Sequence, residues 1–269
     1  MTRLRRPPEL MKLLDEAIHG EKKPAAFVLA GHNGSGKSTL WYQRLAAQLQ
    51  VPLVNADRLT ASILPPPDPQ TSRLPLWAQR LRDDDERWQL LSQEGVRAFI
   101  SLVMEQRMPF AFETVFSHWR ALPDGAHESK ADIIRTLQQA GYLVVLLFVG
   151  LSSVELSMMR VETRKEQGGH GVPLNKLQQR FPRTQHAVGY AAPLADMTLM
   201  FDNSRSLEKA FALVRAQRGD EVLFDCRDSR YSVEAELRAI SAVWLDKVAG
   251  SLASAELGGK TLRGRSKSK

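Results

Sequence analysis

AAFVLAGHNGSGKSTL, residues 25–40, is the stretch that decides the fold of this chain. Apolar residues fill its first half, as in a buried strand, and a glycine loop and the start of a helix follow. From Gly31 to Ser38 the spacing is G-x-x-x-x-G-K-S, the P-loop pattern, in which backbone N–H groups at a helix N-terminus surround phosphate oxygens. The stretch therefore predicts a site for the phosphates of a nucleotide.

Two side chains of this loop have specific roles in the pattern. Lys37 reaches the β- and γ-phosphates, and the hydroxyl of Ser38 holds Mg²⁺. The residues expected to contact the nucleotide are Gly31, Asn33, Gly34, Ser35, Gly36, Lys37, Ser38 and Thr39. A glycine-rich turn without a ligand is the alternative reading, and the apolar strand before the loop and the helical run after it favour the phosphate site.

Four more apolar runs along the chain have the composition of strands. The five expected strands cover residues 25–30, 51–57, 109–115, 142–149 and 197–202. Helical patterns lie between and after them, among them runs at residues 130–140, 175–181 and 207–217. This alternation predicts a three-layer α/β fold built on a mostly parallel five-stranded sheet.

The flanking segments divide the chain further. We expect an N-terminal amphipathic helix and linker at 1–23, the α/β domain at 24–218, an extension with one more strand and a last helix at 219–249, and a basic, disordered tail at 250–269. Proline before the first helix and polar, basic composition at the end support these boundaries.

Composition excludes several classes of protein. The chain has 269 residues, is 43% hydrophobic and 25% charged, and so has enough apolar content to form a core. Cys226 is its only cysteine, which rules out an internal disulfide, and no signal peptide or membrane-spanning run is visible. Of a net charge of +7, much falls in the last twenty residues, which hold five Lys or Arg and one Glu. We therefore expect a cytoplasmic protein that binds neither a membrane nor a specific nucleic acid.

Polar side chains stand where two of the predicted strands end. Asp57 closes the strand after the P-loop helix, and Glu113 and Thr114 interrupt the apolar run that begins at Pro109. Ligands bind outside the carboxyl ends of parallel strands, so these residues are candidates for the reacting groups. Taken alone, Asp57 is as well explained as the N-cap of a following helical turn. As a reacting group it would lie on the strand next to the P-loop strand and deprotonate a hydroxyl.

A basic segment follows the most hydrophobic strand. Arg160 and Arg164 are four residues apart and project from one face of a predicted helix. A glycine-rich link containing His170 comes next, and then a second helix with Arg180 and Arg183. Arginines on either side of a flexible link suit a lid that closes over phosphates, whereas a solvated basic helix with a loop is the alternative.

With these pieces in place, the chain resembles the zeta-toxin family of P-loop kinases over residues 25–205. The matching pieces are Ala30–Thr39, Asn55–Asp57, Phe112–Thr114, Phe148–Leu151, Arg160, Gly168–Pro173, Arg180–Arg183 and Phe201–Ser204. The ordered set is far more specific than the P-loop alone. The resemblance implies a P-loop kinase fold with an arginine-bearing lid, and it places Asn203 in the nucleotide site.

The resemblance also implies an activity. Zeta toxins transfer the γ-phosphoryl group of ATP or GTP, with Mg²⁺, to a hydroxyl of a small metabolite, of which UDP-N-acetylglucosamine is the best known. Asp57 then matches the carboxylate that takes the acceptor's proton, Glu113 one that holds the acceptor, and Arg160 an arginine that meets the γ-phosphate. The family has a hydroxyl residue where this chain has Val115, next to Thr114. Arg164, Arg180 and Arg183 are candidates for a second lid arginine. Candidates for substrate contacts are Thr114, His170, Arg180 and Arg183.

Two functions follow from the sequence. The favoured one is a small-molecule kinase that acts as a toxin and is restrained by an antitoxin protein. The alternative is a nucleotide-dependent binding or switch protein that hydrolyses its nucleotide slowly. A competent acceptor site around Asp57 and Glu113 distinguishes the first from the second.

Overall fold

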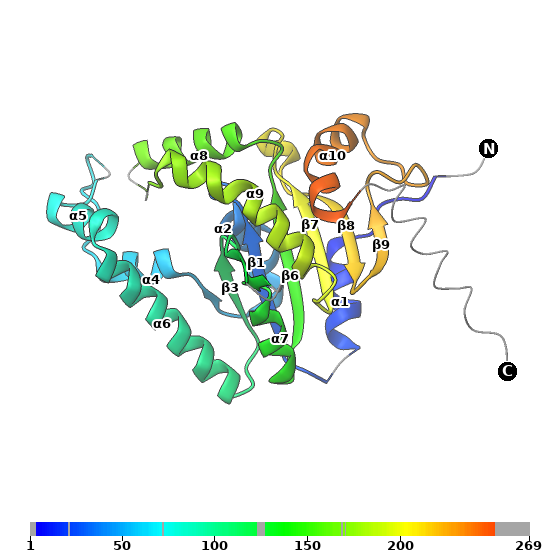
Figure 1. Ribbon diagram of the computed structural model, residues 1–269, viewed down its shortest axis with the longest axis horizontal. Helices are drawn as coiled ribbons and strands as arrows, with labels where there is room; N and C mark the ends of the chain where they lie inside the picture. Colours follow the sequence, from blue (N-terminus) through cyan, green and yellow to red (C-terminus); the bar gives the residue numbers. More distant parts are fainter. Residues whose placement is uncertain are drawn as a thin grey trace.

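A seven-stranded sheet forms the centre of the protein, as the computed structural model shows for residues 4–20, 22–71, 73–122, 127–167, 169 and 171–250 (Figure 1). Its strands are β1 (Ala25–Gly31), β2 (Leu53–Val54), β3 (Phe110–Thr114), β6 (Leu143–Gly150), β7 (Met197–Asp202), β8 (Ala212–Arg218) and β9 (Glu221–Asp225). They lie in the order β2-β3-β1-β6-β7-β8-β9, and the first five are parallel to one another. The predicted three-layer α/β fold with a mostly parallel sheet is confirmed.

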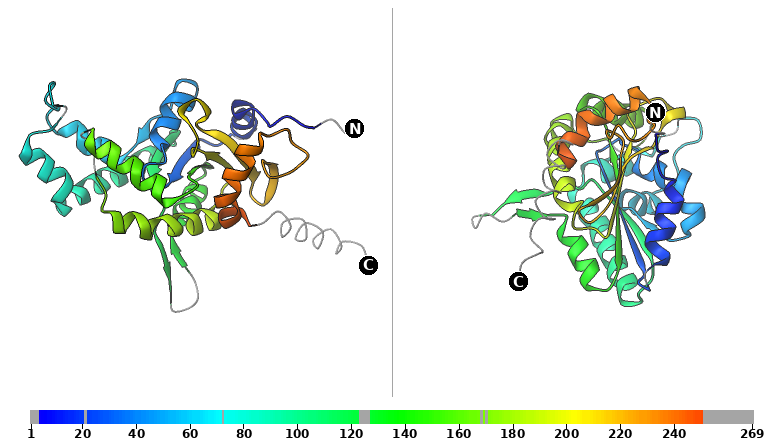
Figure 2. Two further views of the ribbon diagram at one scale, coloured as in Figure 1. Left: turned by 90° about the horizontal axis from the view of Figure 1, so that it is seen from above. Right: turned by 90° about the vertical axis from the view of Figure 1, so that its right-hand side faces the viewer.

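Helices cover both faces of this sheet. They are α1 (Leu10–His19), α2 (Lys37–Leu40), α3 (Ala46–Leu49), α4 (Ala56–Ile63), α5 (Leu76–Asp84), α6 (Glu86–Glu105), α7 (Asp132–Gln139), α8 (Val154–Glu166), α9 (Leu174–Ala191) and α10 (Ala235–Ala249). The π-helical turn Trp41–Leu45 joins α2 to α3. Figure 2 shows α1 and the α2–α3 run on one face, and α7, α9 and α10 on the other. The pair α4 and α6 extends beyond the β2 edge (Figure 1).

The core lies on both sides of the three central strands. Every residue of β1, β6 and β7 is buried, which explains their continuous apolar runs, because a parallel strand is covered on both faces. Phe27 of β1 packs edge-on against Trp41, with ring centroids 5.7 Å apart. These strands hold the P-loop on a rigid base.

Two antiparallel strands extend the sheet beyond the predicted five. The helix expected at 207–217 is wrong: a short 3-10 turn at Leu207–Lys209 is followed by β8. The side chain of Arg215 is buried there and donates to Asp225 of β9 at 2.5 Å, so a polar position in the strand is satisfied by its neighbour. The sequence pattern alone does not reveal that pairing. The further strand expected at 221–226 is present as β9.

Two other boundaries differ from the expectation. The helix expected to end at Pro182 continues as α9 to Ala191. Pro182 and Gln178 are both exposed, so the Gln178 carbonyl that loses its intrahelical donor is on the side that water reaches. The strand expected at 51–57 is only two residues long, and α4 begins at Ala56.

The C-terminal helix is packed onto the α/β core. Trp244 of α10 is fully buried, and its indole N–H donates to the Asp202 carboxylate at the end of β7 at 2.8 Å. A Cβ atom on Gly150 would lie 2.5 Å from the Trp244 ring, so the last residue of β6 has to be glycine for this helix to dock. The extension thus supports the strand ends at which the P-loop lies.

A small hairpin was not expected from the sequence. Strands β4 (Trp119–Ala121) and β5 (His127–Ser129) form an antiparallel pair that projects from the body (Figure 2).

Most of the tail expected at 250–269, residues 251–269, lies outside the described residues. Among the residues that the structure does describe, no helix is both long enough and apolar enough to span a bilayer.

Candidate active site

The P-loop backbone takes a shape that only glycine allows at two positions. Gly34 and Gly36 have φ angles of 69° and 88°. A Cβ on Gly34 would lie 3.0 Å from the Ser157 carbonyl oxygen, and one on Gly36 would lie 2.8 Å from the Asn203 amide nitrogen. The loop is therefore closely packed against its neighbours as well as conformationally demanding.

Two side chains from other elements hold the loop in place. The hydroxyl of Ser157, on α8, donates to the carbonyl oxygen of Asn33 at 2.7 Å. The side-chain amide of Asn203, just after β7, donates to the carbonyl oxygen of Ser35 at 2.8 Å. Carbonyl groups bonded from behind leave the loop N–H groups free to turn toward an anion. Asn203 thus lies against the predicted nucleotide loop.

Lys37 is held at the start of α2. Its ammonium donates to the carbonyl oxygens of Gly31 at 3.3 Å and His32 at 3.0 Å, and it lies 3.6 Å from Oε1 of Glu113. The side chain is only 6% exposed. Burial lowers the pKa of Lys37, the carboxylates of Glu113 and Asp57 oppose that shift, and the positive charge of Arg164 adds to it.

Glu113 is the centre of the hydrogen bonds at this end of the sheet. Its Oε2 accepts from the hydroxyl of Ser38 at 2.5 Å and from the side-chain amide of Asn55 at 2.7 Å. The position follows from the sheet order, since β3 lies directly beside β1 and pairs Leu29 with Glu113. The residue that the resemblance assigns to acceptor binding thus also contacts the P-loop.

The oxygens of Ser38 and Glu113 could share a cation. Mg²⁺ prefers hard oxygen ligands and is held in enzymes by a few protein oxygens together with the phosphates of the substrate. Ser38 donates its single proton to Glu113, which leaves the lone pairs of its oxygen available. In the described part of the chain no group of three or more His, Cys, Asp or Glu could bind a metal by itself. These residues therefore fit Mg²⁺ bound together with a nucleotide.

Asp57 lies in the first turn of α4 and is exposed. Two expectations about its surroundings are wrong. The N-cap of α4 is Asn55, whose Oδ1 accepts from the backbone N–H of Arg58 at 3.1 Å, so Asp57 is not the cap. The strand before it, β2, is separated from β1 by β3. The Asp57 carboxylate is nevertheless close enough to Lys37 to raise that residue's pKa.

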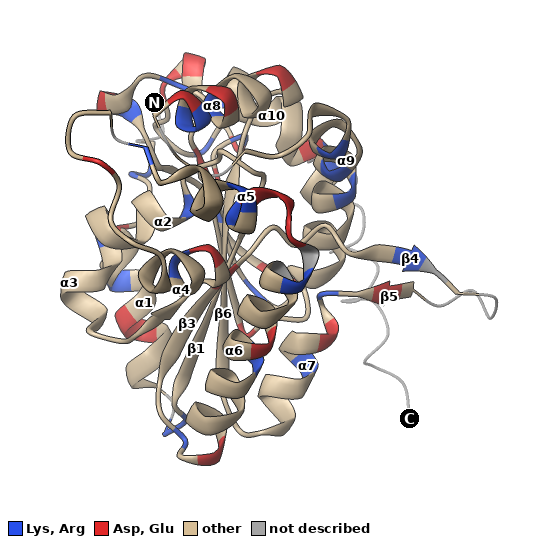
Figure 3. Ribbon diagram, turned by 90° about the vertical axis from the view of Figure 1, so that its left-hand side faces the viewer, with Lys and Arg blue, Asp and Glu red and all other residues tan. Residues whose placement is uncertain are grey.

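The predicted arginines come from two helices, α8 and α9, whose Lys and Arg residues are blue in Figure 3. Arg160 is half-buried on α8, and its Cβ would be 3.2 Å from a Cβ added to Gly34, so it starts directly beside the P-loop. Burial lowers the pKa of Arg160, and the charge of Asp202 opposes the shift. Arg164 is exposed on the same helix, and its charge acts on Lys37. This arrangement places two cations of α8 near the loop.

The remaining predicted site residues lie in different surroundings. Arg180, on α9, lines a small cavity together with Asn33, and Arg183 is exposed on the same helix. The hydroxyl of Thr114 accepts from the backbone N–H of Phe116 at 3.3 Å. His170 lies outside the described residues.

The sequence model of the zeta toxin family matches residues 11–206, more than half of the chain. The chain belongs to the zeta toxin family. None of the curated proteins matches it.

Several solved structures are similar to this chain. A structure of the AvrRxo1-ORF1:AvrRxo1-ORF2 complex with sulphate ions has a TM-score of 0.54 at 16% identity, covering 93% of this chain and 87% of the other. A structure of that complex with ATP has a TM-score of 0.51 at 16% identity and the same coverage. A structure from the PezAT toxin-antitoxin system of Streptococcus pneumoniae has a TM-score of 0.47 at 13% identity, covering 94% and 93%. The AvrRxo1 matches support the fold, and the family makes this chain a P-loop kinase.

One residue of the P-loop, His32, is a buried histidine. His32 is 2% exposed and stacks on Phe181 of α9, with ring centroids 3.8 Å apart and an interplanar angle of 11°. Burial lowers the pKa of His32 to about 3, and the charge of Lys37 adds to the shift. The ring is therefore neutral over the physiological range and joins the loop to α9.

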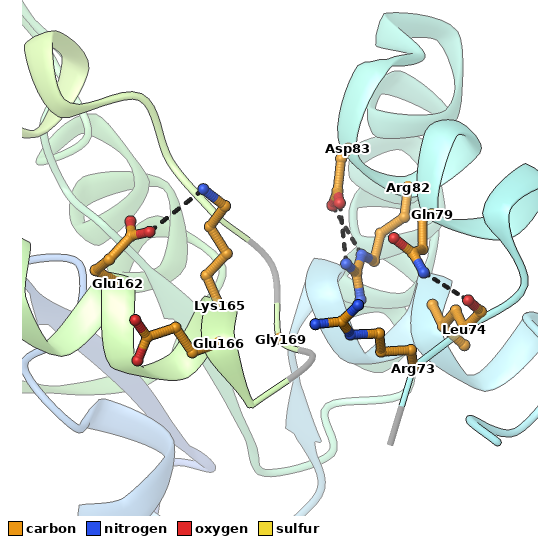
Figure 4. A pocket seen from close by; sticks show the side chains of 9 residues that line it. All are labelled: Arg73, Leu74, Gln79, Arg82, Asp83, Glu162, Lys165, Glu166 and Gly169. Carbon is orange, nitrogen blue, oxygen red and sulfur yellow. Dashed lines mark hydrogen bonds and ion pairs between the residues drawn. The ribbon is translucent and has the colours of Figure 1, made fainter. Parts of the chain in front are cut away.

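A second hollow in this zeta toxin lies between α5 and α8 (Figure 4). Its volume is about 290 Å³. The residues that line it are Arg73, Leu74, Gln79, Arg82, Asp83, Glu162, Lys165, Glu166 and Gly169. None of these lining residues belongs to the P-loop, and they include charges of both signs. We therefore assign the reaction to the surroundings of Lys37 and Glu113 and not to this cavity.

Two residues of the site received no role from the sequence, although Asn55 stands in one of the matching pieces. Ser157 supports the loop from α8, and its position in a polar helix gives no signal of that contact. Asn55 holds Glu113, and its place just before a helix indicates a cap but not the second bond. Both contacts join segments far apart in the sequence.

Proposed function

We propose that this zeta toxin is an ATP- and Mg²⁺-dependent kinase that transfers the γ-phosphoryl group to a hydroxyl of a small metabolite. The observation that carries the proposal is the placement of the Glu113 carboxylate against Lys37, Ser38 and Asn55 at the end of β3. Helix α4, which follows β2 at that edge, carries the carboxylate of Asp57, whose charge acts on Lys37. A phosphate site and a base for an acceptor hydroxyl are thus adjacent.

The chemistry asks little covalent work of the protein. The acceptor oxygen forms a bond to the γ-phosphorus as the bond from that phosphorus to the β-phosphate oxygen breaks, and ADP leaves. Asp57 takes the proton of the acceptor hydroxyl. Lys37 and Arg160 stabilise the charge on the transferred group, with Arg164, Arg180 and Arg183 as candidates for a second arginine. Mg²⁺, held by Ser38 with Glu113 beside it, would neutralise phosphate charge.

Three finer points belong to the same proposal. ATP as the donor is supported by the family and by the AvrRxo1 structure determined with ATP, although GTP would fit the same loop. A nucleotide sugar such as UDP-N-acetylglucosamine as the acceptor is supported by the resemblance to zeta toxins. An antitoxin partner and action in the cytoplasm are supported by membership of the zeta toxin family.

The test uses the purified full chain with ATP, Mg²⁺ and UDP-N-acetylglucosamine, and mass spectrometry of the sugar nucleotide. We expect one phosphoryl group to be gained, and none with Lys37→Ala. Lys12→Ala is the matched control, because Lys12 is an exposed lysine of α1. Release of inorganic phosphate with no phosphorylated acceptor, here or with other small metabolites, would favour the nucleotide-dependent switch instead.

A further inference from the structure

Asn55 uses both ends of its side-chain amide at the junction of β2, β3 and α4. We propose that Asn55 is a positioning residue that fixes the distance between Glu113 and the first turn of α4, which carries Asp57. This inference rests on the proposed function, because it assigns Asn55 a part in the same transfer.

The sheet register places the two residues opposite one another. Strand β2 pairs Val54 with Phe112 of β3, and a polar residue comes next on each side: Asn55 directly after β2, and Glu113 within β3. The amide nitrogen of Asn55 then donates to Oε2 of Glu113 at 2.7 Å. Its Oδ1 accepts from the backbone N–H of Arg58 at 3.1 Å and begins α4.

A helix cap alone does not require asparagine. Serine, aspartate and asparagine cap equally well, because a cap needs only an oxygen that accepts from the first turn. Among these residues only asparagine adds an N–H donor at this reach, and aspartate would place a second negative charge against Glu113. The donor end is therefore explained by Glu113 and not by the helix.

This bond has a consequence for the reacting groups. Glu113 lies within 3.6 Å of the Lys37 ammonium and accepts from Ser38, so its carboxylate is part of the P-loop site. Through Asn55 that same carboxylate is tied to the backbone that orients Asp57. One amide thus sets the spacing between the phosphate side and the base side of the site.

Two substitutions keep the cap and remove the amide N–H that reaches Glu113: Asn55→Ser, whose shorter side chain ends in a hydroxyl, and Asn55→Asp. We expect kcat to fall about 10- to 100-fold in Asn55→Ser, the scale of an error of about 1 Å in placement. We expect a larger fall in Asn55→Asp, because of the repulsion from Glu113, while in Asn55→Ser the KM for ATP and the melting temperature stay close to wild type. Asp85→Ser is the matched control, because Asp85 caps α6 through the backbone N–H groups of Arg87 and Trp88. It should leave kcat unchanged.

A double-mutant cycle identifies the partner. With enzyme in excess over ATP, so that slow transfer is measurable, Asn55→Ser should cost nothing further in a Glu113→Gln background. Unchanged kcat in both single variants, additive losses in the cycle, or a loss of kcat matched by loss of folding would overturn the inference. If wild type hydrolyses ATP but phosphorylates no acceptor, the proposed function fails, and the same variants compared on hydrolysis still decide the role of Asn55.

Discussion

The two halves of the site differ in how firmly their charges are held. In the P-loop half, Lys37 is buried against two carbonyl oxygens, and Glu113 accepts two hydrogen bonds. In the arginine half, Arg160 is half-buried, and Arg164 on α8 and Arg183 on α9 are exposed. We infer from the difference that the P-loop half is arranged before a nucleotide binds, whereas the contacts of Arg160 strengthen when a ligand is bound.

The largest effect is expected at the firmly held half. Lys37→Ala should abolish transfer, a loss of about 1,000-fold or more, because a fixed cation in a buried site cannot be replaced by water. Melting temperature and turnover of the purified variant check this. Near-wild-type turnover would remove Lys37 from the site, and a failure to fold would show that its contacts to Gly31 and His32 serve the structure instead.

Asp57→Asn is expected to cost roughly 100-fold or more in kcat, the usual contribution of a positioned base. Stability should hardly change, because Asn55 and not Asp57 caps α4. ATP affinity by calorimetry should also be unchanged, since asparagine removes the charge without changing the size. Full activity in this variant would make Glu113 the next candidate for the base.

Arg160→Ala tests the arginine half. We expect kcat to fall about tenfold or more while ATP affinity changes little, because a contact that strengthens as charge develops acts on the transition state. Arg160→Lys should recover only part of the rate, since an ammonium lacks the paired donors of guanidinium. Equal losses of rate and affinity would mean that Arg160 is fixed on the ground state, and the contrast between the halves would be lost.

The same contrast separates what the sequence could predict from what it could not. The strand, glycine loop and helix at 25–40 were predictable because the pattern is local. The role of β3 beside β1 was not, because strand order is decided by contacts between distant segments. For the same reason 207–217 was expected as a helix, while the buried Arg215 and Asp225 pair makes it a strand. Roles for Arg164, Arg180 and Arg183 stay predictions.

The smallest effect concerns the contact between the two halves. His32 stays neutral in the folded protein because burial lowers its pKa to about 3, whereas in the unfolded chain it takes up a proton below about pH 6.5. Lowering the pH from 6.5 to 5.5 should therefore reduce the free energy of unfolding through this residue by about 1 kcal/mol. His32→Phe, which keeps the stack on Phe181, should lessen that dependence. An identical pH dependence in both proteins would contradict the burial of the ring.

The most direct test of the kinase assignment leaves the acceptor open. Wild type and Lys37→Ala are each incubated with ATP labelled with ¹⁸O in the γ-phosphate, Mg²⁺ and a protein-free extract of small metabolites, and the products are compared by mass spectrometry. We predict that wild type places the labelled phosphoryl group on one class of hydroxyl compound and that Lys37→Ala places it on none. Label recovered only as inorganic phosphate from wild type, or the same labelled product from both proteins, would contradict the account.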